Sequence, residues 1–219
     1  MPAERPLRDR EFAGLIETMR READGTVLRR ERHLVRMSNS ADALGFAFDR
    51  NEAETLLDDL PRSVALRVRL ELSPDGQFGL TTSPFVPIDP DTVWRVAIAQ
   101  TRLDAGDPLR RHKTTDRAIY GAARSEFPVQ EIDEVLLLNT DGELAEGTIT
   151  TVFLDPGVGI LVTPWLQSGA LPGILRGELL DQGKVVEGRL GVDDIRRAQQ
   201  VFVGNSLRGL IAARLEADA

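Results

Sequence analysis

The sequence predicts a mixed α/β protein of the α+β type with two domains, a small N-terminal domain over residues 1–90 and a larger, barrel-like domain over residues 91–219. Helical patterns followed by a hairpin pattern occupy the first part. A proline-rich segment, residues 84–90, separates the two parts and is typical of a domain boundary. Beyond it, short apolar segments are joined by tight turns, which is typical of a barrel or a strongly curved sheet.

The first domain opens with residues 11–20, whose pattern allows either a strand or a helix. The pair Asp24-Gly25 that follows favours a hairpin turn, and therefore strands on either side of it. Residues 32–46 predict a helix, because apolar residues recur there at helical spacing and Gly45 ends the pattern.

A second helix is predicted from Asn51, which caps it together with Glu54 three residues later, and Pro61 ends it. Residues 64–72 alternate between apolar and charged side chains, which predicts a strand with one wet face. A turn at residues 74–76 then returns the chain as the partner of this strand.

In the second domain the strand-like segments are residues 93–99, 135–138, 148–154 and 160–162. Two helices are predicted to interrupt them, one after Lys113 and one after Pro172.

The composition excludes several classes of function. With 42% hydrophobic and 28% charged residues, the 219-residue chain is that of an ordinary globular protein. Its net charge of -8 leaves no basic excess for nucleic-acid phosphates. No cysteine is present, and His33 and His112 are too far apart in sequence to indicate a metal site. Since the N-terminus lacks a signal-peptide core and no apolar run approaches membrane-spanning length, we expect a cytoplasmic protein without nucleic-acid or membrane partners.

Lys113 is the first candidate for chemistry, since Arg110, Arg111 and Arg117 crowd it between a loop and a helical pattern. In a partly desolvated cleft, burial and like charge would both lower the pKa of this lysine. Such a lysine can react with a carbonyl group. From this stretch alone, however, a basic loop on the surface is the better interpretation.

Three other places carry polar groups that suit an anionic, heteroaromatic ligand. Glu146 precedes a β-branched strand, where a buried carboxylate could keep a heteroaromatic nitrogen protonated; the alternative is an exposed turn glutamate. Pro172-Gly173 predicts a helix start with free backbone amides, and Asn205-Ser206 a small polar turn, both of which can bind phosphate. An ordinary helix start and an ordinary turn would look the same.

Five blocks in order resemble one family. The blocks are His33-Leu34-Val35-Arg36-Met37, His112-Lys113-Thr114-Thr115, Glu146-Gly147, Leu171-Pro172-Gly173-Ile174-Leu175-Arg176 and Asn205-Ser206-Leu207-Arg208-Gly209. Together they resemble the fold-type IV (class IV) pyridoxal-phosphate enzymes, which include branched-chain and D-amino-acid aminotransferases and aminodeoxychorismate lyase. The resemblance extends over about residues 13–210 and is greatest to the lyase, including the lyase half of fused aminodeoxychorismate synthase–lyase chains.

The resemblance implies pyridoxal 5'-phosphate as the cofactor and assigns residues to it. Lys113 matches the lysine that binds the cofactor covalently and then moves the substrate proton. Glu146 matches the glutamate that pairs with the pyridine nitrogen, and Arg36 matches the arginine on the cofactor phosphate. The remaining phosphate-binding positions match Gly173, Ile174, Leu175, Asn205 and Ser206.

The resemblance also implies a function: a homodimeric lyase that converts 4-amino-4-deoxychorismate, a small-molecule amino substrate, to 4-aminobenzoate and pyruvate in the folate pathway. One alternative is a class IV aminotransferase acting on branched-chain or D-amino acids, and another is a degenerate, non-catalytic cofactor-binding protein. Ala118 stands where branched-chain aminotransferases carry a tyrosine, which favours the lyase. Arg20 and Arg208 could face substrate carboxylates, although surface ion pairs would explain them as well.

Two departures from the family motivate the degenerate alternative. Thr151 occupies the place of a common asparagine, and the chain begins too late for the complete N-terminal hairpin of the family.

Overall fold

The computed structural model describes residues 14–216, and this part of the chain divides into two compact units. The first unit extends to Pro87 and includes the segment His112–Asp116; the second contains Ile88–Arg111 and the remaining C-terminal part. The sequence places Lys113 in the second domain, whereas its segment belongs to the first unit. The reason is that the backbone of this segment forms hydrogen bonds with residues 14 and 16, at the beginning of the first strand.

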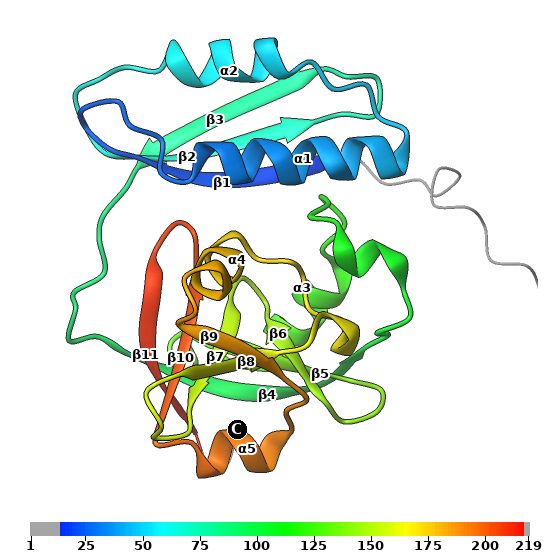
Figure 1. The fold of residues 1–219 in the computed structure, drawn as a ribbon, viewed down its shortest axis with the longest axis vertical. Coiled ribbons are helices and arrows are strands. Elements are labelled where there is room, and N and C mark those ends of the chain that lie inside the picture. Colours follow the sequence, from blue (N-terminus) through cyan, green and yellow to red (C-terminus); the bar gives the residue numbers. More distant parts are fainter. Residues whose placement is uncertain (1–13, 217–219) are drawn as a thin grey trace, which may run out of the picture. The chain divides into compact units, whose positions relative to one another are not determined.

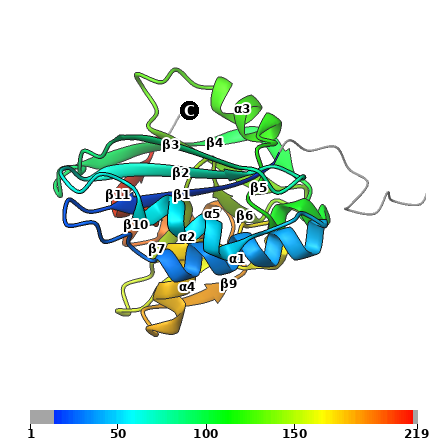
Figure 2. The same ribbon diagram turned by 90° about the horizontal axis from the view of Figure 1, so that it is seen from above.

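The first unit is a three-stranded antiparallel sheet with two helices (Figure 1). Its strands β1 (Leu15–Arg21), β2 (Leu66–Leu72) and β3 (Phe78–Pro84) lie in the order β1-β2-β3. Figure 2 shows α1 (Arg30–Leu44) and α2 (Arg50–Asp58) on the same side of this sheet. Every second residue of β2 is buried, because successive side chains of a strand point to opposite faces. The predicted α+β character of this part is confirmed.

The ends of the two helices test the capping predictions. Helix α1 ends as predicted before Gly45, whose φ of 78° is left-handed and suits glycine. The predicted cap of α2 is wrong by two residues: Asp49 is the N-cap, and its carboxylate accepts hydrogen bonds from amides of the first turn, including that of Asn51. Glu54 does not complete a capping box, since its carboxylate accepts a hydrogen bond from Arg50 Nε at 2.8 Å.

The turn after β1 is present, with Gly25 at a φ of 101°, but the expected hairpin is not. After a single bridge between Arg21 and Val27, the chain enters α1 instead of a second strand. The partner of β1 is β2, along all seven residues Leu15–Arg21. A turn motif shows where the chain reverses, but the strand that pairs with β1 comes from much later in the sequence.

The segment around Lys113 pairs with the outer edge of β1. Ile16 donates its amide hydrogen to the carbonyl of Lys113 at 2.9 Å, and Thr115 donates to the carbonyl of Gly14 at 2.9 Å. An edge strand otherwise presents unpaired backbone groups, so this pairing covers the edge. It also fixes the backbone of Lys113 against β1.

The second unit is built on an eight-stranded sheet in the order β6-β5-β4-β11-β10-β7-β8-β9, visible in Figure 1. The strands are β4 (Val93–Leu103), β5 (Glu134–Asn139), β6 (Leu144–Gly147), β7 (Thr151–Asp155), β8 (Leu161–Pro164), β9 (Val185–Gly188), β10 (Gln200–Asn205) and β11 (Gly209–Leu215). The connections include α3 (Ala118–Ser125), α4 (Ile174–Asp181), α5 (Val192–Arg197) and the 3₁₀ turns η2 (Pro108–Arg111) and η3 (Leu166–Ser168). The sheet is curled into a half-barrel, which confirms the predicted barrel-like domain. Within residues 14–216, no helix has the length and apolar composition needed to cross a bilayer.

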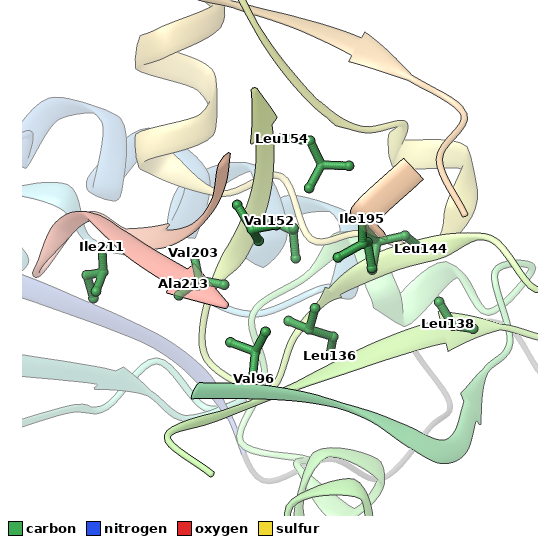
Figure 3. Close-up of a cluster of buried hydrophobic side chains, with 11 residues drawn as sticks. Val96, Leu136, Leu138, Leu144, Val152, Leu154, Ile195, Val203, Ile211 and Ala213 are labelled. Atoms are coloured by element: carbon green, nitrogen blue, oxygen red, sulfur yellow. The ribbon is translucent and has the colours of Figure 1, made fainter. Parts of the chain in front are cut away.

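The largest core of the second unit joins strands that are distant in sequence (Figure 3). Its buried side chains are Val96, Leu136, Leu138, Leu144, Val152, Leu154, Ile195, Val201, Val203, Ile211 and Ala213. Each large aliphatic side chain of this kind stabilises the fold by roughly 1.5–3 kcal/mol when it is fully buried. Helix α5, which the sequence analysis did not predict, contributes Ile195 to this core.

The predicted strand at residues 148–154 is shorter in the structure, since β7 begins at Thr151. The preceding residues form a turn around the buried carboxylate of Glu134, which accepts hydrogen bonds from the hydroxyls of Thr148 and Thr150 at 2.5 and 2.8 Å. Backbone amides of the same turn donate to this carboxylate as well. The Glu134 side chain of β5 therefore holds residues 148–150 in a turn, although their β-branched side chains favour a strand.

Candidate active site

Glu146 lies in β6 as a buried carboxylate with 5% of its surface exposed. The Tyr120 hydroxyl donates a hydrogen bond to its Oε1 at 2.5 Å, and the Leu171 amide donates one to its Oε2 at 3.0 Å. Burying a carboxylate is costly unless donors compensate for the lost water. Glu146 is therefore a held, buried group and not an exposed turn residue.

The residues after Glu146 fold tightly because Gly147 has no side chain. A Cβ on Gly147 would collide with the Thr150 hydroxyl and lie 3.0 Å from the Glu134 carboxylate. Glu146 itself is opposite Leu137 in the antiparallel pair of β6 and β5. The strand pairing and the compact turn together define the position of the Glu146 backbone.

Tyr120 comes from α3, and its ring lies close to two guanidinium groups. The centre of the Arg117 guanidinium is 4.4 Å from the ring centre, and that of Arg110 is 5.5 Å away. Burial and the neighbouring Glu146 raise the pKa of Tyr120, although Arg110 and Arg117 oppose the shift. The phenol is therefore protonated at neutral pH and acts as the donor. No sequence pattern singles out Tyr120 as a site residue, beyond its being the single tyrosine of the chain.

Helix α4 begins at Ile174 and Leu175, with Gly173 as its N-cap. Gly173 has no side chain that could cap this end, so the first amides of α4 are left as donors for an anion. A Cβ on Gly173 would lie 2.7 Å from the Thr151 hydroxyl oxygen. Thr151, the departure from the family's asparagine, thus packs directly against the start of α4.

The side chain of Asn205, at the end of β10, connects two loops. Its Nδ2 donates to the carbonyl of Ile149 at 3.1 Å, and its Oδ1 accepts from the amides of Leu207 and Arg208 at 3.1 and 3.0 Å. Both ends of the amide are engaged within the protein. Asn205 therefore organises the turn that contains Ser206.

The structure brings the predicted residues of the second unit into one connected region. Leu171, which holds Glu146, lies two residues before Gly173. A Cβ on Gly204 would lie 3.1 Å from Leu175 Cδ2, so the end of β10 packs closely against α4.

In the first unit, Lys113 is partly buried, and its charge is one of the causes that lower the pKa of buried His33, the largest being burial itself. The neighbouring His112 lies with its Nδ1 3.0 Å from the Ser40 hydroxyl of α1. The chain contains only two lysines, and the other one, Lys184, is exposed. Lys113 is therefore the one partly buried lysine that could react covalently with a cofactor.

Arg36 of α1 binds the carboxylate of Glu17 with two hydrogen bonds, from Nε to Oε1 and from Nη2 to Oε2, each 2.7 Å long. His33 Nδ1 lies 2.6 Å from the same Oε2. Burial by itself would raise the pKa of Glu17, but the charges of Arg36 and His33 and their hydrogen bonds lower it to about 2. Glu17, which no sequence pattern singles out, holds the predicted phosphate-binding arginine.

The two arginines considered for substrate binding lie in different units and both contact aromatic rings. The guanidinium of Arg20 is 4.5 Å from the centre of the Phe85 ring and forms an ion pair with Glu22 at 2.8 Å. The guanidinium of Arg208 is 5.8 Å from the centre of the Trp94 ring.

Groups within each unit have chemistry that suits pyridoxal phosphate. A buried carboxylate complements a protonated ring nitrogen, and a helix start without a side-chain cap complements a phosphate group. Lys113 is a partly buried amine for the aldehyde. In residues 14–216, no three or more His, Cys, Asp or Glu side chains are grouped so that they could bind a metal ion.

Residues 14–215 match the family described as "Amino-transferase class IV". The chain therefore belongs to this family of pyridoxal-phosphate-dependent enzymes, and the predicted family, fold class and cofactor are confirmed.

Individual relatives differ in the reaction that their names state. The chain is 31% identical over 192 residues to "Putative aminodeoxychorismate lyase" of Schizosaccharomyces pombe, a match that covers 84% of this chain and 83% of the relative. It is 50% identical to the solved structure of a "Putative amino-acid aminotransferase" from Mesorhizobium loti, with a TM-score of 0.89 and coverage of 93% and 99% of the two chains. The fold also matches a PLP-bound "hypothetical aminotransferase" from Mycobacterium tuberculosis (21% identity, TM-score 0.81, covering 93% of this chain and 81% of that one).

Proposed function

We propose that this enzyme is a lyase that converts 4-amino-4-deoxychorismate to 4-aminobenzoate and pyruvate in the folate pathway. The observation that carries the cofactor part of the proposal is the buried Glu146 carboxylate, which accepts hydrogen bonds from Tyr120 and Leu171. Leu171 lies in the loop that leads to the start of α4, where no N-cap side chain is present. The choice of a lyase is supported by the similarity to the Schizosaccharomyces pombe protein and by Ala118 at the position where branched-chain aminotransferases carry a tyrosine.

In this proposal each residue has a physical task. Lys113 would hold the cofactor and would remove the proton from the amine-bearing carbon of the substrate. Glu146 keeps the ring nitrogen protonated, and the bound cofactor then supplies an electron sink for the negative charge. The amides of Ile174 and Leu175 bind the phosphate at the positive end of α4, and the guanidinium of Arg36, which Glu17 holds in place, is the proposed cationic partner of the phosphate.

Further residues shape the phosphate and substrate sites. Gly173 leaves room for the start of α4 against Thr151, and Asn205 orders the turn that presents Ser206. The substrate carries two carboxylates, for which Arg20 and Arg208 are the proposed partners. Lysine substitutions at these two arginines are expected to raise KM more than they lower kcat, because the lysine ammonium lacks the planar fork that binds a carboxylate.

The stoichiometry of the reaction provides the test. All atoms of the substrate appear in the two products, and the proton taken from the amine-bearing carbon is balanced by the one that completes the methyl group of pyruvate. No second substrate is needed. The purified enzyme should therefore release pyruvate and 4-aminobenzoate from 4-amino-4-deoxychorismate in the absence of any 2-oxo acid. Strict dependence on a 2-oxo acid would exclude the lyase.

The lysine anchor is tested separately from the reaction. Borohydride reduction of the cofactor-loaded protein, followed by peptide mass mapping, should label Lys113 and leave Lys184 unlabelled. The visible band of the cofactor should disappear in Lys113→Ala and persist in Lys184→Ala. A label on Lys184, or a band that survives in Lys113→Ala, would contradict this assignment.

The second candidate function is a class IV aminotransferase, favoured by the 50% identity to the Mesorhizobium loti protein. This reaction would use the same cofactor site but would transfer the amino group to a 2-oxo acid. Its expected result is amino-group exchange between a branched-chain or D-amino acid and 2-oxoglutarate, with no pyruvate from 4-amino-4-deoxychorismate.

The assembly and location follow from the family resemblance. We propose a homodimer in the cytoplasm, for which sedimentation should give a mass of twice 24.1 kDa. A monomer mass across the working concentration range would exclude the dimer.

A further inference from the structure

The Glu146 carboxylate is held on both of its oxygens by groups of the second unit. Tyr120 donates to Oε1 at 2.5 Å, and the Leu171 amide donates to Oε2 at 3.0 Å. Two donors on two different oxygens restrict rotation about the bond to the carboxyl carbon. The plane of the carboxylate, as well as its position, is thereby defined.

The donor on Oε1 is a neutral phenol that acts on a charged acceptor. A bond of this kind is short, 2.5–2.7 Å between oxygens, and stronger than a bond between neutral groups. Because Tyr120 stays protonated at neutral pH, its hydroxyl can donate one hydrogen bond, and the Glu146 carboxylate accepts this bond.

The ring that carries this hydroxyl is itself restrained. Arg117 lies against the Tyr120 ring at 4.4 Å and donates a hydrogen bond to the carbonyl of Thr148, in the turn that follows Glu146. Arg110 lies 5.5 Å from the ring and 3.6 Å from Asp107. The hydroxyl therefore cannot swing away from Glu146 without breaking the contacts of the ring.

We propose that Tyr120 is a positioning residue for the cofactor: with the Leu171 amide, it orients the Glu146 carboxylate so that an oxygen lone pair faces the ring nitrogen of pyridoxal phosphate. This inference rests on the proposed role of Glu146. Tyr120 acts through Glu146, to which its hydroxyl donates.

Titration of the apo protein with pyridoxal phosphate, followed by absorbance, tests the inference in Tyr120→Phe. The phenyl ring keeps the contacts with Arg117 and loses only the hydroxyl. The dissociation constant should rise about tenfold, equivalent to about 1.4 kcal/mol, because one charge-assisted hydrogen bond is lost. With the carbocyclic analogue, in which C–H replaces the ring nitrogen, the same substitution should leave the dissociation constant unchanged. An equal effect on both ligands would overturn the inference.

A double-mutant cycle and a matched control separate positioning from folding. In the Glu146→Gln background, Tyr120→Phe should weaken binding by less than about twofold, since the two residues act as a unit; full additivity would contradict the proposal. Thr163→Val removes another buried hydroxyl, which donates to the carbonyl of Val152 at 2.8 Å. This control should lower the melting temperature and leave cofactor affinity unchanged.

The outcomes distinguish this inference from the proposed function. If the wild-type protein does not bind pyridoxal phosphate, the cofactor role of Glu146 is wrong. If the wild-type protein binds it and Tyr120→Phe binds it equally well, only the positioning role of Tyr120 is wrong.

Discussion

Replacing Glu17 with Gln is expected to destabilise the first unit by about 3 kcal/mol at pH 7. Glu17 is 1% exposed and lies within hydrogen-bond distance of both Arg36 and His33. The glutamine keeps the shape of the side chain but leaves the partly buried guanidinium of Arg36 without its bidentate carboxylate. Removing one member of a buried ion pair costs more than the pair contributes, because the remaining charge stays buried.

The magnitude follows from the pKa of Glu17. Its value falls from 4.5 to about 2 in the folded protein. Each pKa unit corresponds to about 1.4 kcal/mol, so ionised Glu17 stabilises the fold by about 3 kcal/mol. A carboxyl group whose pKa is lower in the folded than in the unfolded protein stabilises the fold at pH values above its unfolded pKa. This stabilisation is lost as the pH falls toward its folded pKa. Between pH 6 and pH 3 the wild type should therefore lose about 2 kcal/mol through Glu17 alone.

His33 contributes in the same direction in both proteins. Burial lowers the pKa of His33, so the unfolded chain binds a proton more readily, and acid favours unfolding below about pH 6.5. Because Glu17 itself raises the pKa of His33, Glu17→Gln lowers that pKa further. The difference in stability between the two proteins at pH 7, where His33 is neutral in both, is therefore the quantity that reports on Glu17.

Urea unfolding at successive pH values, followed by far-UV circular dichroism and by hydrogen exchange of β1 and α1 peptides, measures this difference. Tryptophan fluorescence is unsuitable, because Trp94 and Trp165 both belong to the second unit. The control Glu22→Gln removes a partly exposed ion pair with Arg20 and should change the stability by less than about 1 kcal/mol. The reasoning is refuted if Glu17→Gln is as stable as the wild type at pH 7.

Three further tests concern the local structure, and two of them include a matched control substitution. Asp49→Ala should lower the free energy of unfolding by about 1 kcal/mol through loss of the α2 cap, whereas Asn51→Ala should change it by less than about 0.5 kcal/mol in the same urea titration. Gly204→Ala places a Cβ 2.6 Å from a backbone oxygen and should cost about 1–3 kcal/mol, while Gly121→Ala in α3 meets no atom within 4 Å and should raise the melting temperature. Glu134→Gln removes a carboxylate that accepts five hydrogen bonds and should cost about 2–3 kcal/mol; an unchanged melting temperature would contradict this.

Elements with strong local patterns were predicted well. Helix α1 and strand β2 have an apolar spacing that suits only one secondary structure, and both occur close to the predicted bounds. The sequence places the cap of α2 at Asn51, because Asp and Asn are both favourable N-cap residues. The helix begins at Arg50, which makes Asp49 the N-cap. The short helix α5 was missed because six residues are too few for a helical pattern to be recognised.

Contacts between distant residues were not predictable in this way. Tyr120 and Glu146 are separated by 26 positions, and Glu17 and Arg36 by 19. Nothing in the periodicity of either segment indicates that the two side chains meet. The carboxylate of Glu134 likewise replaced a predicted strand with a turn, although the β-branched residues themselves favour a strand.

By itself, the sequence determined the α+β class, the order of most elements and the family, because periodicity and ordered motifs are local properties of the chain. Only the tertiary structure decided which groups hold Glu146 and Arg36, and that the segment of Lys113 pairs with β1. The physical reason is that a buried charge takes its partners from whichever segments pack around it. Those segments are chosen by the burial of the whole core and not by the residues next to the charge.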